Sequence, residues 1–184
     1  MPTAQDWVRA ALDFIGEGGL PAVAVEPIAV RLGATKGSFY WHFPNKTALV
    51  DSALAHWEKE NTEGVIATVD AEPDPALRLR KLFSAVPSAT GGDPVEISLM
   101  AAAKNPQVAE VLRRVTERRI DYVAQIFTDL GFPPDEARLR GLLAYTAHLG
   151  KVQMIHAVPS ALPASVEEQE RYRDLMLYMI LRRD

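Results

Sequence analysis

The chain has 184 residues, of which 48% are hydrophobic and 24% are charged, a composition that is ordinary for a globular protein. It contains no cysteine, which excludes disulfide bonds, thiolate metal sites and cysteine nucleophiles. The formal net charge of −4 argues against a protein that coats nucleic acid without specificity. Because we find neither a signal-peptide pattern nor an apolar run of about 18 residues, we expect a cytoplasmic protein without a membrane span.

Helical periodicity dominates the sequence and no segment alternates with period two, which predicts an all-α fold of about nine helices. Thr3 is a good N-cap residue, and Asp6 three positions later predicts a capping box at the first helix. The glycine-rich stretch 16–19 predicts the end of that helix. A short second helix follows, and Gly33 is expected to end it.

Thr35 is expected to cap a third short helix that runs to about Phe43. Asn45 then caps a long fourth helix, which we expect to extend to about residue 69. A proline-rich acidic stretch follows this helix, and start signals at proline divide the remaining chain. The five further helices are predicted over residues 75–86, 94–104, 106–130, 134–158 and 166–181.

The stretch "GATKGSFYWHFPNK" places four aromatic residues and a histidine in five consecutive positions. On a helix over 35–43, Phe39 and Phe43 share one face and can join a small core. Trp41 and Gly37 then point away from that core, flanked by Ser38 and Tyr40. The exposed face of this helix is therefore predicted to be a contact surface.

Two short helices joined at a tight glycine turn predict a helix-turn-helix, whose second helix fits the major groove of DNA. Gly37 allows close approach of a DNA strand, and Thr35, Ser38 and Tyr40 can donate to phosphate oxygens. Lys46 lies in the first turn of the fourth helix, a natural anion site. Lys36 can reach guanine acceptors and Trp41 can pack on a thymine methyl group.

The segment "IAVRLGATKGSFYWHFPNKTALV" resembles the N-terminal DNA-binding domain of the tetracycline-repressor (TetR) family of transcriptional regulators. The matching residues are Ile28, Ala29, Leu32, Gly33, Lys36, Gly37, Tyr40, His42, Phe43, Lys46 and Leu49. The resemblance implies a DNA-binding domain over 1–46 and a helical ligand-binding and dimerisation domain over 47–184, joined by the helix of residues 45–69. It adds His42 to the DNA-binding residues, as a phosphate contact.

The same resemblance implies a homodimer that binds a palindromic operator through successive major grooves, about 34 Å apart. It further implies a repressor that a small-molecule inducer releases from DNA.

Two features depart from the family pattern. Ala24 stands where a Ser or Thr cap is usual, and residues 1–46 carry four basic and four acidic side chains. We therefore predict a shallow salt dependence of DNA binding, with a slope on the order of −4 to −6 for a dimer.

The predicted helices 134–158 and 166–181 are apolar on more than one face, which is unusual at a monomer surface. The resemblance implies that they form a four-helix bundle with their symmetry mates, whereas a buried pair inside a monomer is the alternative. Six side chains of the middle segment, mostly apolar with a few polar groups, are candidates for the lining of a ligand cavity. They are Phe83, Met100, Tyr122, Phe127, Tyr145 and His148, and core packing is the competing interpretation for each.

No motif of a hydrolase, phosphate-binding loop or metalloprotease is present, so we expect neither an enzyme nor a cofactor. His148 and His156 are eight positions apart without a ligand-type residue between them, so we expect no metal site. Two other functions stay open on the sequence alone. One is a helical ligand-binding or enzymatic dimer that does not bind DNA. The other is an adaptor that binds a partner protein through Tyr40 and Trp41.

Overall fold

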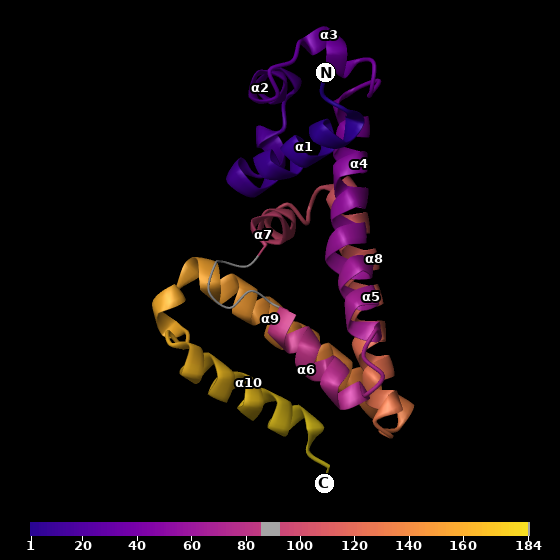
Figure 1. Cartoon of the computed structure of the whole chain (residues 1–184), viewed down its shortest axis with the longest axis vertical. Coiled ribbons are helices and arrows are strands. Elements are labelled where there is room, and N and C mark those ends of the chain that lie inside the picture. The colour runs from indigo at the N-terminus through magenta and orange to yellow at the C-terminus, as the bar shows by residue number, and fades with distance from the viewer. Residues whose placement is uncertain (86–92, 184) are drawn as a thin grey trace. The chain divides into compact units, whose positions relative to one another are not determined.

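The computed structural model describes residues 1–85 and 93–183, and these form helices but no strand, which confirms the all-α prediction. α4, a π-helical segment and α5 follow one another without a break, so the described part of the chain has nine helices when this run counts once (Figure 1). The α-helices are α1 (Ala4–Gly18), α2 (Val25–Arg31), α3 (Lys36–Phe39), α4 (Lys46–Glu58), α5 (Val65–Asp70), α6 (Pro75–Ala85), α7 (Pro94–Ala101), α8 (Pro106–Asp129), α9 (Pro134–Ala157) and α10 (Val166–Leu181).

The chain divides into two compact units. The first comprises Met1–Glu63 and Asp93–Val115 and is called the N-terminal unit; the second comprises Gly64–Gly92 and Thr116–Asp184 and is called the C-terminal unit. The predicted boundary between residues 46 and 47 separates a DNA-binding domain from a ligand-binding domain. The two compact units do not test this division of function, so it stays a prediction. Val86, the expected last residue of the fifth predicted helix, lies outside the described residues.

The ends of α1 agree with the sequence signals. The backbone N–H of Thr3 donates to Asp6 Oδ2 at 2.7 Å and the N–H of Asp6 donates to Thr3 Oγ1 at 3.3 Å, which completes the predicted capping box. At the other end Gly19 has φ of +74°, a conformation that side-chain-bearing residues rarely adopt, and its N–H caps the carbonyl of Ile15.

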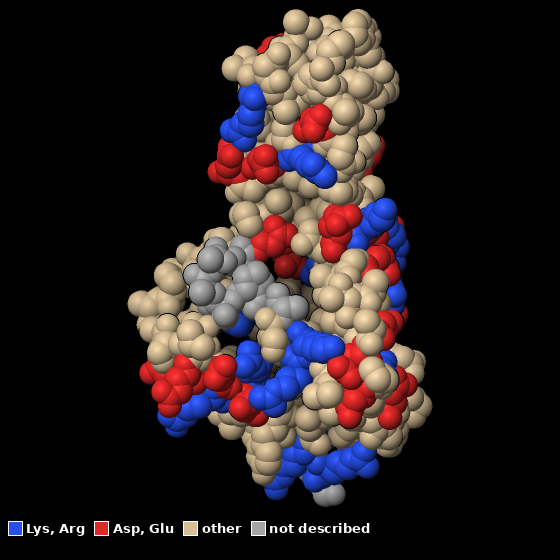
Figure 2. Space-filling view, viewed as in Figure 1, with Lys and Arg blue, Asp and Glu red and all other residues tan. Residues whose placement is uncertain are grey.

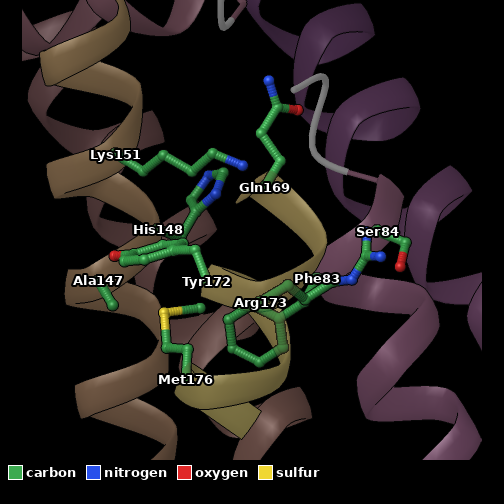
Figure 3. Close-up of a pocket in the computed structure, with 9 residues that line it drawn as sticks. All are labelled: Phe83, Ser84, Ala147, His148, Lys151, Gln169, Tyr172, Arg173 and Met176. Atoms are coloured by element: carbon green, nitrogen blue, oxygen red, sulfur yellow. The ribbon is translucent and has the colours of Figure 1, made fainter. Parts of the chain in front are cut away.

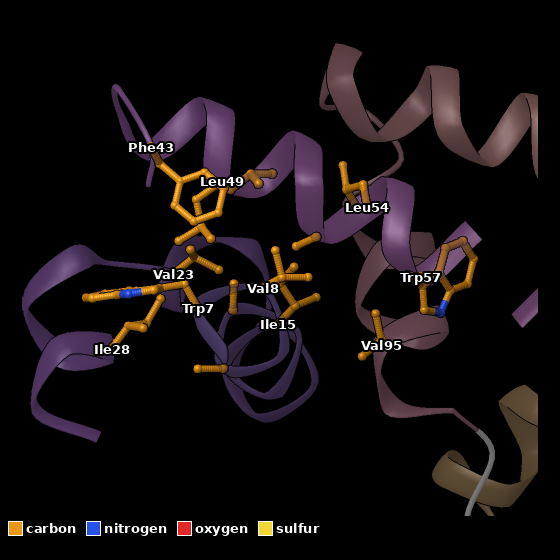
Figure 4. Packing of buried hydrophobic residues seen from close by; sticks show 14 of the residues in the cluster. Trp7, Val8, Ile15, Val23, Ile28, Phe43, Leu49, Leu54, Trp57 and Val95 are labelled. Carbon is orange, nitrogen blue, oxygen red and sulfur yellow. The ribbon is translucent and has the colours of Figure 1, made fainter. Parts of the chain in front are cut away.

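The core of the N-terminal unit forms around α1, which contacts both α4 and α7 (Figure 4). Trp7 and Phe39 are fully buried with ring centroids 5.3 Å apart, and Phe43 stacks on Phe39 at 5.7 Å. Burying one such side chain contributes about 1.5–3 kcal/mol. The predicted inward face of the third helix is therefore confirmed, and this core holds the helix-turn-helix against α1 and α4.

Asn45 caps α4 as predicted, because its Oδ1 accepts a hydrogen bond of 2.9 Å from the N–H of Ala48. The predicted run to about residue 69 ends at Asp70 in the structure. A π-helical segment, Lys59–Gly64, interrupts the α-helical pattern, and the sequence did not indicate it. Thr62 of this segment is buried.

The C-terminal unit has its own core, which includes Leu79, Ile126 and Phe127, all fully buried. α9 crosses the second half of α8 closely at Gly141, where an added Cβ would lie 3.0 Å from the Ile120 carbonyl oxygen. The predicted capping box at α10 is present between Ser165 and Glu168. The α7 to α10 boundaries agree with the predictions to within three residues, since proline and cap residues mark them in the sequence.

Candidate nucleic-acid interface

The turn between α2 and α3 has the geometry that the sequence predicted. Gly33 has φ of +61°, and the N–H of Ala34 donates to the Ala29 carbonyl at 2.8 Å, which satisfies a carbonyl at the end of α2. Ala24 occupies the N-cap position of α2 and makes no side-chain cap, so the departure noted in the sequence is present in the structure. Thr35 caps α3 by accepting a 3.2 Å hydrogen bond from the N–H of Ser38.

The third helix is shorter than predicted, because α3 ends at Phe39 rather than near Phe43. Tyr40 has φ of −69° and ψ of −10°, and the next residues continue as a tight turn in which the N–H of His42 donates to Phe39. Pro44 disfavours the helical conformation for Phe43 before it, so the turn does not return to a helix before α4. The surface predicted to contact DNA is therefore formed by one short helix and the turn that follows it.

Two aromatic side chains of this turn are exposed as predicted: Trp41 is 74% exposed and Tyr40 is 54% exposed. Gly37 is exposed too, and its missing side chain leaves room beside Thr35. The prediction that Ser38 lies on the exposed face is wrong. Its hydroxyl donates to the Thr35 carbonyl at 2.7 Å and the residue is buried, because a serine three positions after a carbonyl can bond back to it.

The two basic residues nearest the turn are paired within the domain. Lys36 Nζ lies 2.5 Å from Glu26 Oε1, and this hydrogen bond raises the pKa of Lys36 and lowers the pKa of Glu26. Arg31 makes two hydrogen bonds of 2.8 Å to the carboxylate of Glu17 and lies over the ring of Phe14. Figure 2 shows few charged side chains on the visible face around α2 and α3. Uncharged side chains therefore make up most of the visible part of this surface.

The predicted phosphate contacts lie at the end of the turn and the start of α4. His42 Nε2 donates to the Pro2 carbonyl at 3.1 Å, so this assignment of the ring proton leaves Nδ1 as the acceptor. Lys46 is the first residue of α4 and is exposed. The α4 N-terminus, with its unpaired backbone N–H groups, is favourable for an anion.

The six candidate ligand-binding residues do not line one common cavity in the structure. Phe127 is fully buried core, and the Tyr122 hydroxyl donates to Asp70 at 2.8 Å. Met100 belongs to the N-terminal unit. Tyr145 is buried with its ring stacked 6.1 Å from that of His148.

Phe83 and His148 line a small pocket in the C-terminal unit, with a cavity volume of about 30 Å³. Sequence reasoning missed seven residues of this pocket: Ser84, Ala147, Lys151, Gln169, Tyr172, Arg173 and Met176. Of these, Gln169, Arg173 and Met176 lie on one face of α10 at helical spacing, but this spacing alone does not indicate a pocket.

Together the positive-φ turn, the buried Phe39 and the exposed Trp41 define a helix-turn-helix DNA-binding module. The family model described as "Bacterial regulatory proteins, tetR family" matches residues 8–53. The N-terminal domain of this chain is thus similar to the DNA-binding domains of tetR-family regulators.

Curated relatives match the same region. The tetracycline repressor protein class A from transposon 1721 of Escherichia coli is 41% identical over 54 residues, which are 29% of this chain and 25% of that protein. The uncharacterised regulator TtgW of Pseudomonas putida is 36% identical over 53 residues, 29% of this chain and 40% of that protein. The chain thus spans less than half the length of these relatives.

Solved structures match the fold of nearly the whole chain. A transcriptional regulator from Rhodococcus sp. Rha1 covers 98% of this chain and 96% of its own, with a TM-score of 0.79 and 22% identity. AibR, solved with isovaleryl coenzyme A and operator DNA, covers 96% of each chain, with a TM-score of 0.66 and 20% identity. Within the described residues we find no cluster of metal ligands, and none of the helices there is long and apolar enough to cross a membrane.

Proposed function

We propose that the protein is a sequence-specific transcriptional regulator that represses its target genes from a palindromic operator, as a cytoplasmic homodimer released by a small molecule. The observation that carries the proposal is the exposed Trp41 on the turn after α3, opposite the buried Phe39. A core requires only the inward face of this segment. An exposed tryptophan beside Gly37 and Tyr40 therefore needs a partner surface, and the helix-turn-helix supports DNA.

The proposed contacts follow from the geometry of the module. Thr35, Lys36, Gly37 and Trp41 lie on α3 and its turn and would approach base edges or the sugar–phosphate backbone beside them. Phosphate oxygens would be held by Tyr40 and Lys46, and by Nδ1 of His42 when the ring is protonated at both nitrogens. Ser38 has an indirect role, since its hydroxyl supports the cap of α3 from within.

The homodimer is supported by apolar side chains that α9 and α10 leave exposed, since a monomer rarely shows a large apolar patch. They are Leu139, Leu142, Leu143, Met154, Leu175, Tyr178 and Met179. A symmetric contact through these helices would bury them. We expect Leu143→Glu to convert a dimer to a monomer in sedimentation velocity, while Leu77→Glu, at an exposed leucine of α6, leaves the dimer intact.

Release by a ligand requires that the ligand bind one dimer geometry better than another. A ligand in the C-terminal unit would favour a geometry whose two α3 helices no longer fit successive major grooves. The structural neighbour AibR, which was solved with both a ligand and operator DNA, supports this mode of action. α4 would link the two events, since the helix that begins beside the DNA-binding turn continues through the π segment into α5.

The test is selection of bound sequences from random duplex DNA by the full-length protein. We expect an enriched inverted repeat, lost in Trp41→Ala and kept in Leu77→Ala, a truncation of an exposed side chain outside the module. Failure of the folded wild-type dimer to enrich any sequence at low salt would overturn the proposal and favour a ligand-binding dimer without DNA binding.

A further inference from the structure

A pocket in the C-terminal unit combines basic and apolar side chains from three helices (Figure 3). We propose that it binds a small organic anion, with a carboxylate or phosphate group held between Lys151 and Arg173 and an apolar remainder against Phe83 and Met176. The inference names the class of effector that the regulator would sense. Its regulatory role therefore rests on the proposed function.

The three helices place the polar groups on opposing walls. Figure 3 shows His148 and Lys151 projecting from α9, one helical turn apart, while Gln169 and Arg173 project from α10. Phe83 and its neighbour Ser84 come from the end of α6. A molecule in the pocket would therefore meet hydrogen-bond donors from two helices at once.

The charge of the lining has one sign. The nine residues that form the pocket include Lys151, Arg173 and His148 but no aspartate or glutamate. Lys151 makes no ion pair within the part of the chain that the structure describes. Burial, and then the charge of Arg173, lower the pKa of Lys151.

Arg173 is also incompletely satisfied. Its side chain is mostly buried, and its Nε is buried without a hydrogen-bond partner. One acid approaches it, Glu170 on the same helix, at 3.8 Å from Nη2, and that carboxylate is largely exposed. Such a pair is weak, because the separation is long and water screens it. The guanidinium therefore has donors left for a ligand oxygen.

Two cations that line one pocket with a single weak counter-ion oppose folding, and groups arranged in this way are typical of binding sites rather than of cores. A bound anion would supply the missing negative charge to both. The remaining lining defines what the anion is attached to. Phe83, Tyr172 and Met176 present aromatic and thioether surface, and methionine adapts to varied apolar shapes. The ligand is thus an acid with an apolar body.

Calorimetric titration of the full-length protein tests this assignment with three matched probes: 3-phenylpropionate, phenyl phosphate and the neutral 3-phenylpropionamide. We expect an anion to bind and the amide to bind at least about tenfold more weakly, as loss of a charge-assisted hydrogen bond implies. Lys151→Met and Arg173→Met should each weaken anion binding by a similar factor. Arg171→Met is the control, since Arg171 is an exposed arginine two positions from Arg173 that does not line the pocket.

The melting temperature of the ligand-free variants gives a second measurement, and it also shows whether each variant folds. Lys151→Met should melt above the wild type at low ionic strength, because it removes the repulsion, whereas Arg171→Met should not. Failure of both anions to bind the wild type, or equal binding of acid and amide, overturns the inference. Operator selection is measured separately, so a protein that binds the acid but no DNA sequence retains this inference and loses the proposed function.

Discussion

Lys36 Nζ lies 2.5 Å from Glu26 Oε1, so the helix-turn-helix neutralises the basic side chain at the start of its own reading helix. Both side chains are more than half exposed, and such a pair is readily exchanged for a phosphate. DNA binding would therefore have to break the pair. This arrangement agrees with the equal numbers of acidic and basic residues in segment 1–46.

We predict that Glu26→Gln strengthens DNA binding and steepens its salt dependence. The free Lys36 of each subunit would add one phosphate contact, and the slope of log K against log salt would grow in magnitude by about 2 per dimer. Fluorescence anisotropy across a salt series measures this slope. Glu167→Gln, which removes an exposed acid of α10, should leave it unchanged. An unaltered slope in Glu26→Gln would show that Lys36 does not reach the backbone.

Ser38→Ala should lower stability but not operator affinity, and Trp41→Ala should lower operator affinity but not stability. The Ser38 hydroxyl bonds to Thr35 inside the module, so its loss should lower the free energy of unfolding by about 0.5–1.5 kcal/mol. Operator affinity at a temperature where the protein is folded should stay close to that of the wild type. Trp41 is 74% exposed, so its truncation should reduce affinity and leave stability nearly unchanged. Urea unfolding and operator titration of both variants separate the two roles.

Local signals made most of the fold predictable. Capping residues such as Thr3, Asn45 and Ser165 act within a few positions, so the helix starts they mark could be read directly from the sequence. The exposed Trp41 followed from its spacing to Phe39. Ser38 was misplaced because a hydroxyl can be satisfied by its own backbone, a choice that residue type does not reveal.

The pocket could not be predicted because it depends on packing between helices distant in sequence. Lys151 and Arg173 come from α9 and α10, and nothing in either segment alone indicates that the two cations share one space. Most of the candidates chosen by residue type were aromatic, and two of them, Tyr122 and Phe127, belong to the core instead. Aromatic residues are common in both settings, so type alone does not distinguish them.

Tyr122 gives a pH-dependent prediction. Burial, and then the hydrogen bond to Asp70, raise the pKa of its phenol above the ordinary value of about 10. The folded protein holds this proton more tightly than the unfolded chain does. The resulting stabilisation is complete below pH of about 10 and is lost as the pH rises above it. The wild type should therefore lose stability more steeply than Tyr122→Phe between about pH 9 and 11 in urea unfolding. If the free energy of unfolding fell equally with pH in the two proteins, the raised pKa of Tyr122 would be contradicted.

Two glycines of α9 should respond oppositely to the same substitution. An added Cβ at Gly141 would lie 3.0 Å from both the Ala124 nitrogen and the Ile120 carbonyl oxygen, which are backbone atoms that cannot move aside without shifting α8. Overpacking of this kind costs about 1–3 kcal/mol, more than the gain in helix propensity. At Gly150 no atom of the described residues outside the helix backbone lies within 4 Å of the added atom, so Gly150→Ala should stabilise the protein by about 0.4–1 kcal/mol.

The measurement is the free energy of unfolding by urea, with circular dichroism as the probe and the protein concentration held constant. Both substitutions replace glycine by alanine in one helix, so they gain the same helix propensity. The difference between their changes in the free energy of unfolding therefore measures the contact with α8. Destabilisation of Gly141→Ala alone would confirm that α8 and α9 pack at backbone distance there. Equal effects of the two substitutions would mean that the crossing can open to accept a methyl group.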